Sequence, residues 1–458
     1  MDSVFTSDTE QAACPMASVD HAWLRMDTPV NPMVINAVIS FKQPLNTEDC
    51  IQQITSQLLS NKIFRSKPGS SIYGAQWQQT KVDESYHFSI CHQRLKDDQA
   101  LQAQATDFIN QPLDHNRPLW RVLLVPHCKS GGALVVRIHH AYADGMALMK
   151  VLLKLMDERE LIEYYEKQQT SKQKKPRKNR TVALFSKLQN YMPGNGKWLE
   201  ALGLVDELTT ELLKLGLSPG EENAFKKPGL CGKKQLVWTK PLNLDEVKTI
   251  AKFQHAKVND VLLNSVSGAF RRYLKSIDQL SAWSEMKAVI PVDLRQHVNA
   301  RELGNYFGLV FLSLPLGTED PIERSRLLHK RMNALKDSKQ AWLTFQLLQL
   351  AGYLPEIIEK ELIQLFSSKG SMVMTNVPGP QFPLHLSGNE IDQIMFWVPQ
   401  SGSIGIGVSI LTYNNHVQFG LMTDKQIIPN PEKLIDFFTE EFESLLLETL
   451  MTVQWPSA

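Results

Sequence analysis

The sequence predicts an α/β protein made of two lobes, and three observations lead to this prediction. Apolar, β-branched runs alternate with segments whose apolar residues recur at helical spacing, and both halves of the chain show this mixture. A basic, polar segment separates the halves near residue 170. The chain has 458 residues, more than one ordinary hydrophobic core accommodates. We therefore expect a first lobe at residues 1–165, a basic and helical linker at 166–230 and a second lobe at 231–458.

In the first half, three β-branched apolar runs predict strands. They are Val34–Lys42, Trp120–His127 and Gly132–His140. The segment Thr47–Asn61 has apolar residues at helical spacing, and Thr47 is the expected N-cap of that helix. A long helix is expected to begin at Gly145.

The second half repeats the mixture. A strand leads into a helix that is entered near Asn243, and another helix begins at Val258. Apolar runs at Met286–Arg295 and Tyr306–Leu316 predict strands, and Asn430–Leu450 predicts a closing helix.

The basic segment holds six Lys and Arg residues between Lys172 and Arg180. Such a composition is typical of an exposed connector, and the alternative is a patch that contacts anionic membrane beside an amphipathic stretch, Thr181–Met192. We expect no nucleic-acid partner, because the net charge is only +1 and no aromatic platform or binding motif accompanies the basic residues.

Composition narrows the class of protein further. Hydrophobic residues are 43% and charged residues 21%, which is ordinary for a soluble globular chain. The five cysteines are scattered, odd in number and free of CxxC pairs, which fits a reducing compartment. The acidic, polar N-terminus does not resemble a signal peptide, and no uncharged apolar run reaches the roughly 18 residues that span a bilayer. We expect a cytoplasmic protein whose only route to lipid is peripheral contact.

Two adjacent histidines, His139 and His140, end the apolar run "LVVRIHH". Because side chains alternate between the faces of a strand, His140 is expected to share a face with Ile138, and His139 with Arg137. An imidazole in an apolar wall is held toward its neutral form, which can accept a proton from a hydroxyl group. His140 is therefore a candidate general base.

Asp144 and Gly145 follow at the expected junction of strand and helix. Asp144 can cap the helix, and Gly145 removes a side chain where backbone or ligand comes close. A buried carboxylate needs a cation, for which Arg65, Arg137 and Arg295 are candidates.

Two other interpretations of this stretch stay open. Both histidines can be core residues that end a strand, with Asp144 as an ordinary helix cap. Histidine and aspartate are also metal ligands, but neighbouring histidines on a strand point to opposite faces and no HExxH or CxxC motif is present. We expect no metal.

The stretch "HHAYADG" (His139–Gly145) matches the HHxxxDG pattern of the CoA-dependent acyltransferase superfamily, which is similar in fold to chloramphenicol acetyltransferase and to peptide-synthetase condensation domains. Further blocks, in the same order along the chain, resemble those of bacterial wax ester synthase/acyl-CoA:diacylglycerol acyltransferases. They are Ser18–Met33, "RPLWR" (Arg117–Arg121), "VNDVLL" (Val258–Leu263), "PVDLR" (Pro291–Arg295), "GNYFG" (Gly304–Gly308) and "TNVPGP" (Thr375–Pro380), where Thr375 replaces the usual serine. The resemblance covers nearly the whole chain.

The resemblance implies two chloramphenicol-acetyltransferase-like lobes joined by the helical linker, with the active-site channel between them. It implies transfer of a long-chain fatty acyl group from acyl-CoA to a long-chain alcohol, giving a wax ester, or to diacylglycerol, giving a triacylglycerol. His140 would remove the hydroxyl proton and return it to the CoA thiolate. Acyl-CoA is then a substrate, and no cofactor is implied.

The resemblance also implies roles for other residues. His139 would orient the loop, and Asp144 would pair with an arginine, Arg65 first and Arg295 as the alternative. Oxyanion or supporting groups are expected among Asn259, Asp260, Thr375 and Asn376. The channel wall, or simply the core, would include Pro118, Leu119 and Trp120. A plain alternative for Asn259 and Asp260 is that they cap a helix.

Two rival functions remain. The first is a condensation-type acyltransferase that takes carrier-bound acyl groups, which the PLW-like and NVPGP-like blocks disfavour. The second is an inactive protein that binds a lipid surface, which the intact HHxxxDG pattern disfavours.

Overall fold

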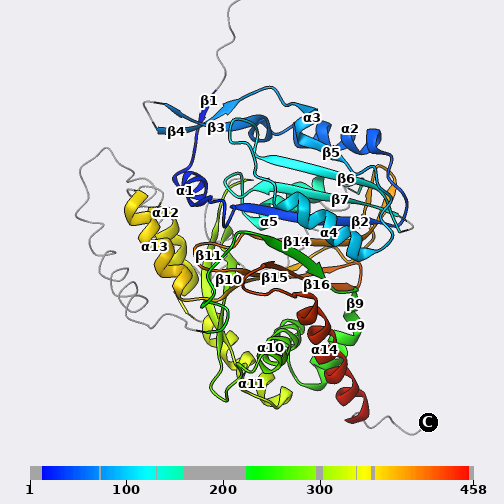
Figure 1. The fold of residues 1–458 in the computed structure, drawn as a ribbon, viewed down its shortest axis with the longest axis vertical. Coiled ribbons are helices and arrows are strands. Elements are labelled where there is room, and N and C mark those ends of the chain that lie inside the picture. The colour runs from blue at the N-terminus through cyan, green and yellow to red at the C-terminus, as the bar shows by residue number, and fades with distance from the viewer. Residues whose placement is uncertain are drawn as a thin grey trace, which may run out of the picture.

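The computed structural model describes residues 13–71, 74–129, 131–158, 223–295, 303–336, 338–351 and 356–452. Most of the linker expected at 166–230 lies outside these ranges, and so do the residues after 158 over which the long helix from Gly145 was expected to continue. Figure 1 shows two large sheets next to each other, with helices packed around them.

A six-stranded sheet with the order β13-β14-β2-β7-β6-β5 carries most of the first half. Its strands are β2 (Val34–Phe41), β5 (Phe88–Ile90), β6 (Trp120–Cys128), β7 (Gly131–His139), β13 (His385–Leu386) and β14 (Asn389–Trp397). Strand β7 runs antiparallel to β2 and β6 and is buried at every position. Burial on both faces explains why its sequence is almost continuously apolar.

Helices cover both faces of this first sheet. Helices α2 (Thr47–Leu58) and α5 (Gly145–Lys154) pack on the face that carries Leu134 and Val136, and α4 (Asp98–Ile109) packs on the opposite face. A three-stranded sheet of β1 (Ala13–Pro15), β3 (Ser66–Ser71) and β4 (Gly74–Gln79) lies with α1 (Ser18–Met26), α3 (Glu84–His87) and the 3-10 turn η1 (Lys62–Arg65) in the same half.

The second sheet has seven strands in the order β11-β10-β12-β15-β16-β8, and β9 also pairs with β16. The strands are β8 (Lys234–Trp238), β9 (Leu242–Asn243), β10 (Met286–Asp293), β11 (Phe307–Leu314), β12 (Met372–Pro378), β15 (Ile406–Tyr413) and β16 (His416–Asp424). One face is covered by α9 (Leu244–Phe253), α10 (Val258–Ser276), α11 (Pro321–Lys336) and α14 (Glu432–Thr452). Helix α12 (Gln340–Ala351) packs against α1 and β11, and α13 (Glu356–Ser368) follows it.

Strand β14 ties the two halves together. It follows β12 in the chain, yet it pairs with β2 of the first sheet, and it also contacts β15 and β16 of the second (Figure 1). The core cluster around β7 likewise contains Phe307 and Val377 from the second half. The sequence boundary at residue 231 therefore does not separate the two sheets, because β13 and β14 lie beyond it and belong to the first.

Most of the expected elements are confirmed, with three differences at their ends. The helix that begins at Gly145 ends at Lys154 and is therefore shorter than the long helix expected there. The Asn46 side chain, and not Thr47, caps α2 by accepting from the Glu48 amide at 3.1 Å. The second of the two strands before the helix ends at His139 and not at His140. Within the described ranges, no helix combines the length and apolar composition needed to cross a bilayer.

Candidate active site

His140 directly follows the last residue of β7. Its amide donates to the Met33 carbonyl at 2.8 Å, which extends the ladder between β7 and β2 by one step. The ring stacks on Trp23 of α1, with the centroids 4.0 Å apart, and meets Phe307 of β11 at 5.7 Å. Ile138 belongs to the same apolar cluster as Trp23 and Phe307, which agrees with the strand face expected for His140.

The surroundings of His140 keep its ring neutral. The residue is 3% exposed, and burial lowers the pKa of the imidazole to about 4, although the nearby Asp144 carboxylate acts in the opposite direction. At neutral pH the ring is therefore uncharged and can accept a proton.

His139 shapes the turn that carries His140. Its main-chain N–H donates to the Leu119 carbonyl at 2.9 Å, and its Nδ1 accepts from the Ala141 amide at 3.1 Å. An amide N–H only donates, so Nδ1 is unprotonated and Nε2 carries the ring hydrogen. Nε2 lies 3.7 Å from Oδ2 of Asp27.

Asp144 caps α5 and binds an arginine at the same time. Its Oδ1 accepts from the Ala147 amide at 3.0 Å, and its Oδ2 accepts from Arg295 Nη2 at 2.7 Å and from the Tyr306 amide at 2.9 Å. Arg295 also donates to the Gly304 carbonyl at 2.9 Å. This carboxylate thus fastens the loop after β7 to the segment that precedes β11.

Arg65, which we expected first as the partner of Asp144, forms no ion pair among the described residues. It ends η1, and its carbonyl accepts from the Thr80 amide at 2.8 Å. The buried Arg137, another candidate, donates to the Phe108 carbonyl at 3.0 Å. The partner is Arg295, which lies 151 residues away from Asp144 in the sequence.

Gly145 is the first residue of α5 and faces the end of β14. A Cβ atom at this position would meet Val398 Cγ1 at 3.4 Å and Phe396 Cε2 at 3.6 Å, which are ordinary contacts. The space beside Gly145 is therefore filled by the protein's own strand, and a small side chain would fit there.

Three residues that the sequence analysis did not single out support His140. Trp23 stacks on its ring, and Asn305 Nδ2 donates to its carbonyl at 3.2 Å. The same Asn305 amide donates to Asp20 Oδ1 at 2.8 Å. Two of the blocks that carried the family resemblance contain these residues, Ser18–Met33 and Gly304–Gly308, so the signal was present in the sequence.

Two of the residues that were expected to stabilise the oxyanion contact each other. Asn376 Nδ2 donates to Asn259 Oδ1 at 2.6 Å, which joins the end of β12 to the start of α10. The hydroxyl of Thr375 is buried and donates to the Val408 carbonyl at 3.4 Å. Within the described part of the chain, none of these three residues hydrogen-bonds to His140.

Asp260 supports the start of α10. Its carboxylate accepts from the Lys257 amide at 3.0 Å and lies 2.8 Å from His329 Nδ1. This contact agrees with the alternative in which the residue caps a helix, although the N-cap position itself is Lys257.

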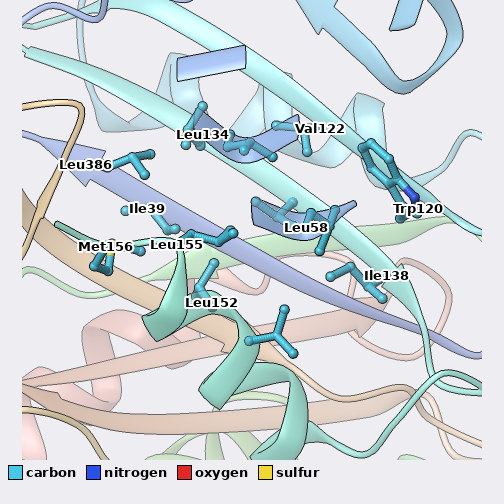
Figure 2. A pocket seen from close by; sticks show the side chains of 13 residues that line it. Ile39, Leu58, Trp120, Val122, Leu134, Ile138, Leu152, Leu155, Met156 and Leu386 are labelled. Carbon is cyan, nitrogen blue, oxygen red and sulfur yellow. The ribbon is translucent and has the colours of Figure 1, made fainter. Parts of the chain in front are cut away.

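Pro118, Leu119 and Trp120 are buried where β6 begins. The Leu119 amide donates to the Tyr142 hydroxyl at 2.8 Å, so this block braces the loop that follows His140. Trp120 lines a pocket between the first sheet and helices α2 and α5, and every side chain around this pocket is apolar or aromatic (Figure 2). The three residues thus contribute to the core, and Trp120 also to a cavity wall.

One group of potential metal ligands is found in the described residues. Asp27, His115 and His139 each offer a ligand atom, and these atoms lie within 4.8 Å of one another. His139 is buried, Asp27 is half-buried and His115 is exposed.

Comparison with solved structures defines the fold. The chain resembles the first condensation domain of the CDA synthetase, with a TM-score of 0.59 and 12% identity over 96% of this chain and 97% of that one. It resembles a wax ester synthase/diacylglycerol acyltransferase from Marinobacter aquaeolei with a TM-score of 0.68 and 18% identity, over 95% of this chain and 99% of that one. These similarities show the two-lobe fold shared by condensation domains and acyltransferases.

Sequence comparison identifies the family. Residues 16–262 match the wax ester synthase/diacylglycerol acyltransferase catalytic domain, and residues 303–446 match the WS/DGAT C-terminal domain. The chain belongs to this family and is an O-acyltransferase. It is 22% identical over 456 residues to the O-acyltransferase WSD of Acinetobacter baylyi, covering 94% of this chain and 96% of that relative.

Proposed function

We propose that this enzyme transfers a long-chain fatty acyl group from acyl-CoA to a long-chain alcohol or to diacylglycerol, in a channel between the two halves, with His140 as the general base. The observation that carries the proposal is the neutral ring of His140, held between Trp23 and Phe307 where the halves meet. The wax ester synthase/diacylglycerol acyltransferases that the chain resembles suggest the two classes of acceptor.

The reaction needs no acyl-enzyme intermediate. The ring of His140 takes the hydroxyl proton while the alcohol oxygen attacks the thioester carbonyl, and a tetrahedral oxyanion forms. The C–S bond then breaks, the carbonyl reforms as an ester, and the imidazolium returns the proton to the CoA thiolate. General base catalysis of this kind contributes roughly 10²–10⁴-fold.

The oxyanion requires hydrogen-bond donors. Thr375 already directs its hydroxyl to the Val408 carbonyl, which leaves the side-chain amides of Asn259 and Asn376 as the stronger candidates. These two residues join β12 to α10 and are therefore held in a fixed relation to each other.

Both acceptors are poorly soluble in water, so peripheral contact with a membrane or lipid droplet is part of the proposal. Ile357 and Ile358 of α13 are 77% and 48% exposed and could enter such a surface. Replacing both with serine should reduce flotation with liposomes of anionic phospholipid, while turnover of a short, soluble alcohol persists.

The decisive experiment is product analysis with palmitoyl-CoA offered together with hexadecanol and diacylglycerol. His140→Ala should lower ester formation by at least about 10²-fold, whereas the exposed His127→Ala should not. Unchanged turnover by the His140 variant would rule out the base assignment. Turnover of a carrier-bound acyl thioester but not of palmitoyl-CoA would favour a condensation-type enzyme.

A further inference from the structure

Asp27, at the end of α1, is linked to both histidines of the HHxxxDG motif. Its Oδ1 accepts from the Met33 amide at 2.6 Å. The carbonyl of Met33 in turn accepts from the His140 amide at 2.8 Å. The other carboxylate oxygen of Asp27, Oδ2, lies 2.9 Å from His115 Nε2 and 3.7 Å from His139 Nε2. One carboxylate is therefore linked through Met33 to the main chain of His140, and it also faces the ring of His139.

The ring of His139 has one tautomer that fits its surroundings. Its Nδ1 accepts from the Ala141 amide, a bond that spans His140. Nε2 is buried and has no hydrogen-bond partner among the described residues, and the nearest charged group to it is the Asp27 carboxylate at 3.7 Å. In the other tautomer, Nδ1–H would point at the Ala141 N–H, and the turn around His140 would open.

Asp27 is in the correct charge state to favour that tautomer. Its burial raises the pKa, but the hydrogen bonds from His115 and the Met33 amide, together with the nearby ring of His139, more than offset this, and the pKa lies well below the usual range. The carboxylate is thus ionised at neutral pH and attracts the Nε2 hydrogen.

We propose that Asp27 is a positioning residue of the acyl-transfer site, which fixes the tautomer of His139 and the main chain at His140 and so sets the place of the reacting imidazole. This inference rests on the proposed function of His140. Asp27 acts through the two histidines and does not touch the substrate.

A metal ion at Asp27, His115 and His139 is the competing explanation. Metal binding through Nε2 of His139 would require the hydrogen to move to Nδ1, where the Ala141 amide already donates. The hydrogen-bonded arrangement therefore favours positioning by the carboxylate over metal binding.

The test compares Asp27→Asn and Asp27→Glu with Asp83→Asn. Asp83 is a matched control, because it also pairs with a charged side chain, Arg117 at 2.6 Å, but has no contact with either histidine of the motif. Steady-state kinetics with palmitoyl-CoA and hexadecanol give kcat and KM. ¹⁵N NMR of histidine-labelled enzyme, with the signal of His139 assigned through His139→Gln, reports the tautomer.

We expect Asp27→Asn to lower kcat by about 10–100-fold with little change in KM, because a misplaced group slows the chemical step more than it weakens binding. Its His139 signal should change toward a mixture of tautomers, and Asp27→Glu should recover part of kcat. The Asp83 variant should keep wild-type kinetics and the wild-type His139 signal.

Two results would overturn the inference. One is an Asp27→Asn enzyme with wild-type kcat and an unchanged His139 tautomer. The other is wild-type activity that disappears with a chelator and returns with Zn²⁺. If wild-type enzyme makes no ester, the proposed function fails, and the NMR comparison still decides whether Asp27 fixes the His139 tautomer.

Discussion

Burial and hydrogen bonding shift the pKa values of the histidines near the site in opposite directions. His140 is enclosed by aromatic rings and has a pKa lowered to about 4, whereas the exposed His115 has a pKa raised by its hydrogen bond to Asp27. His139 is fully buried, and burial lowers its pKa as well. The pKa values of these histidines are thus shifted in opposite directions, and burial favours the neutral form of both histidines of the motif.

The first prediction concerns the pH profile. Because only the neutral ring of His140 accepts a proton, kcat/KM should stay level as the pH falls through the ordinary histidine value of 6.5 and decline only toward about 4. Initial rates with palmitoyl-CoA and hexadecanol measured across this range check the prediction. A decline centred at 6.5 would contradict it.

That measurement needs a folding control at each pH. His87 and His140 both have a pKa lowered to about 4 by burial, so below pH 6.5 the unfolded chain binds more protons than the folded one. The free energy of unfolding should therefore fall as the pH falls from 6.5 toward 4. Circular dichroism at each pH separates this loss from a loss of the base.

The second prediction concerns the ion pair of Asp144 with Arg295. Asp144→Asn keeps an acceptor for the helix cap but removes the charge opposite Arg295, and should lower the free energy of unfolding by about 3 kcal/mol. In a double-mutant cycle, adding Arg295→Gln should reveal a coupling of about 0.5–3 kcal/mol, whereas adding Arg65→Gln should be additive within about 0.5 kcal/mol. Urea denaturation measures both, and coupling to Arg65 instead would refute the observed pairing.

At the scale of elements, local sequence determines where helices begin. Asn243 caps α9 by accepting from the Asp245 amide at 2.8 Å, as its position predicted. At α2 the same kind of side chain, Asn46, takes the cap from Thr47 because its oxygen reaches two following amides. Both caps depend on side chains within a few residues of the helix start, and predictions of helix ends are commonly wrong by one residue.

The third prediction tests this cap. Asn46→Ala should lower the free energy of unfolding by about 1 kcal/mol, because the Glu48 amide loses its acceptor. Thr47→Ala is the control and should change it by no more than about 0.5 kcal/mol. Chemical denaturation of both variants checks the prediction, and an equal or larger loss for Thr47→Ala would restore Thr47 as the cap.

At the scale of the whole molecule, β14 makes the two halves depend on each other. The strand completes the first sheet beside β2 and contacts β15 and β16 of the second. Removing the second half would leave β2 with an unpaired edge and expose apolar residues of the shared core. The halves should therefore unfold together.

The fourth prediction is that calorimetry shows one cooperative unfolding transition for the two halves joined by β14. The side chain of Ile394 in β14 is 2% exposed. Ile394→Ala should lower the free energy of unfolding by about 2–5 kcal/mol and move the single transition to a lower temperature. The exposed Asp392→Ala in the same strand should leave it within about 0.5 kcal/mol of wild type. Two separated transitions, with only one affected by Ile394→Ala, would refute the interdependence.

The sequence by itself determined the α/β class, most strands and helices, the motif that names the family, and the face on which His140 lies, because these follow from local periodicity and short spacings. The tertiary structure decided what distant segments do. In the folded chain Asp144 pairs with Arg295 and not with Arg65, and β14 pairs with β2 in the first sheet. Trp23, Asp27 and Asn305 lie next to the two histidines or to residues bonded to them. No spacing rule relates residues that far apart, since their contacts depend on how the whole chain buries its apolar surface.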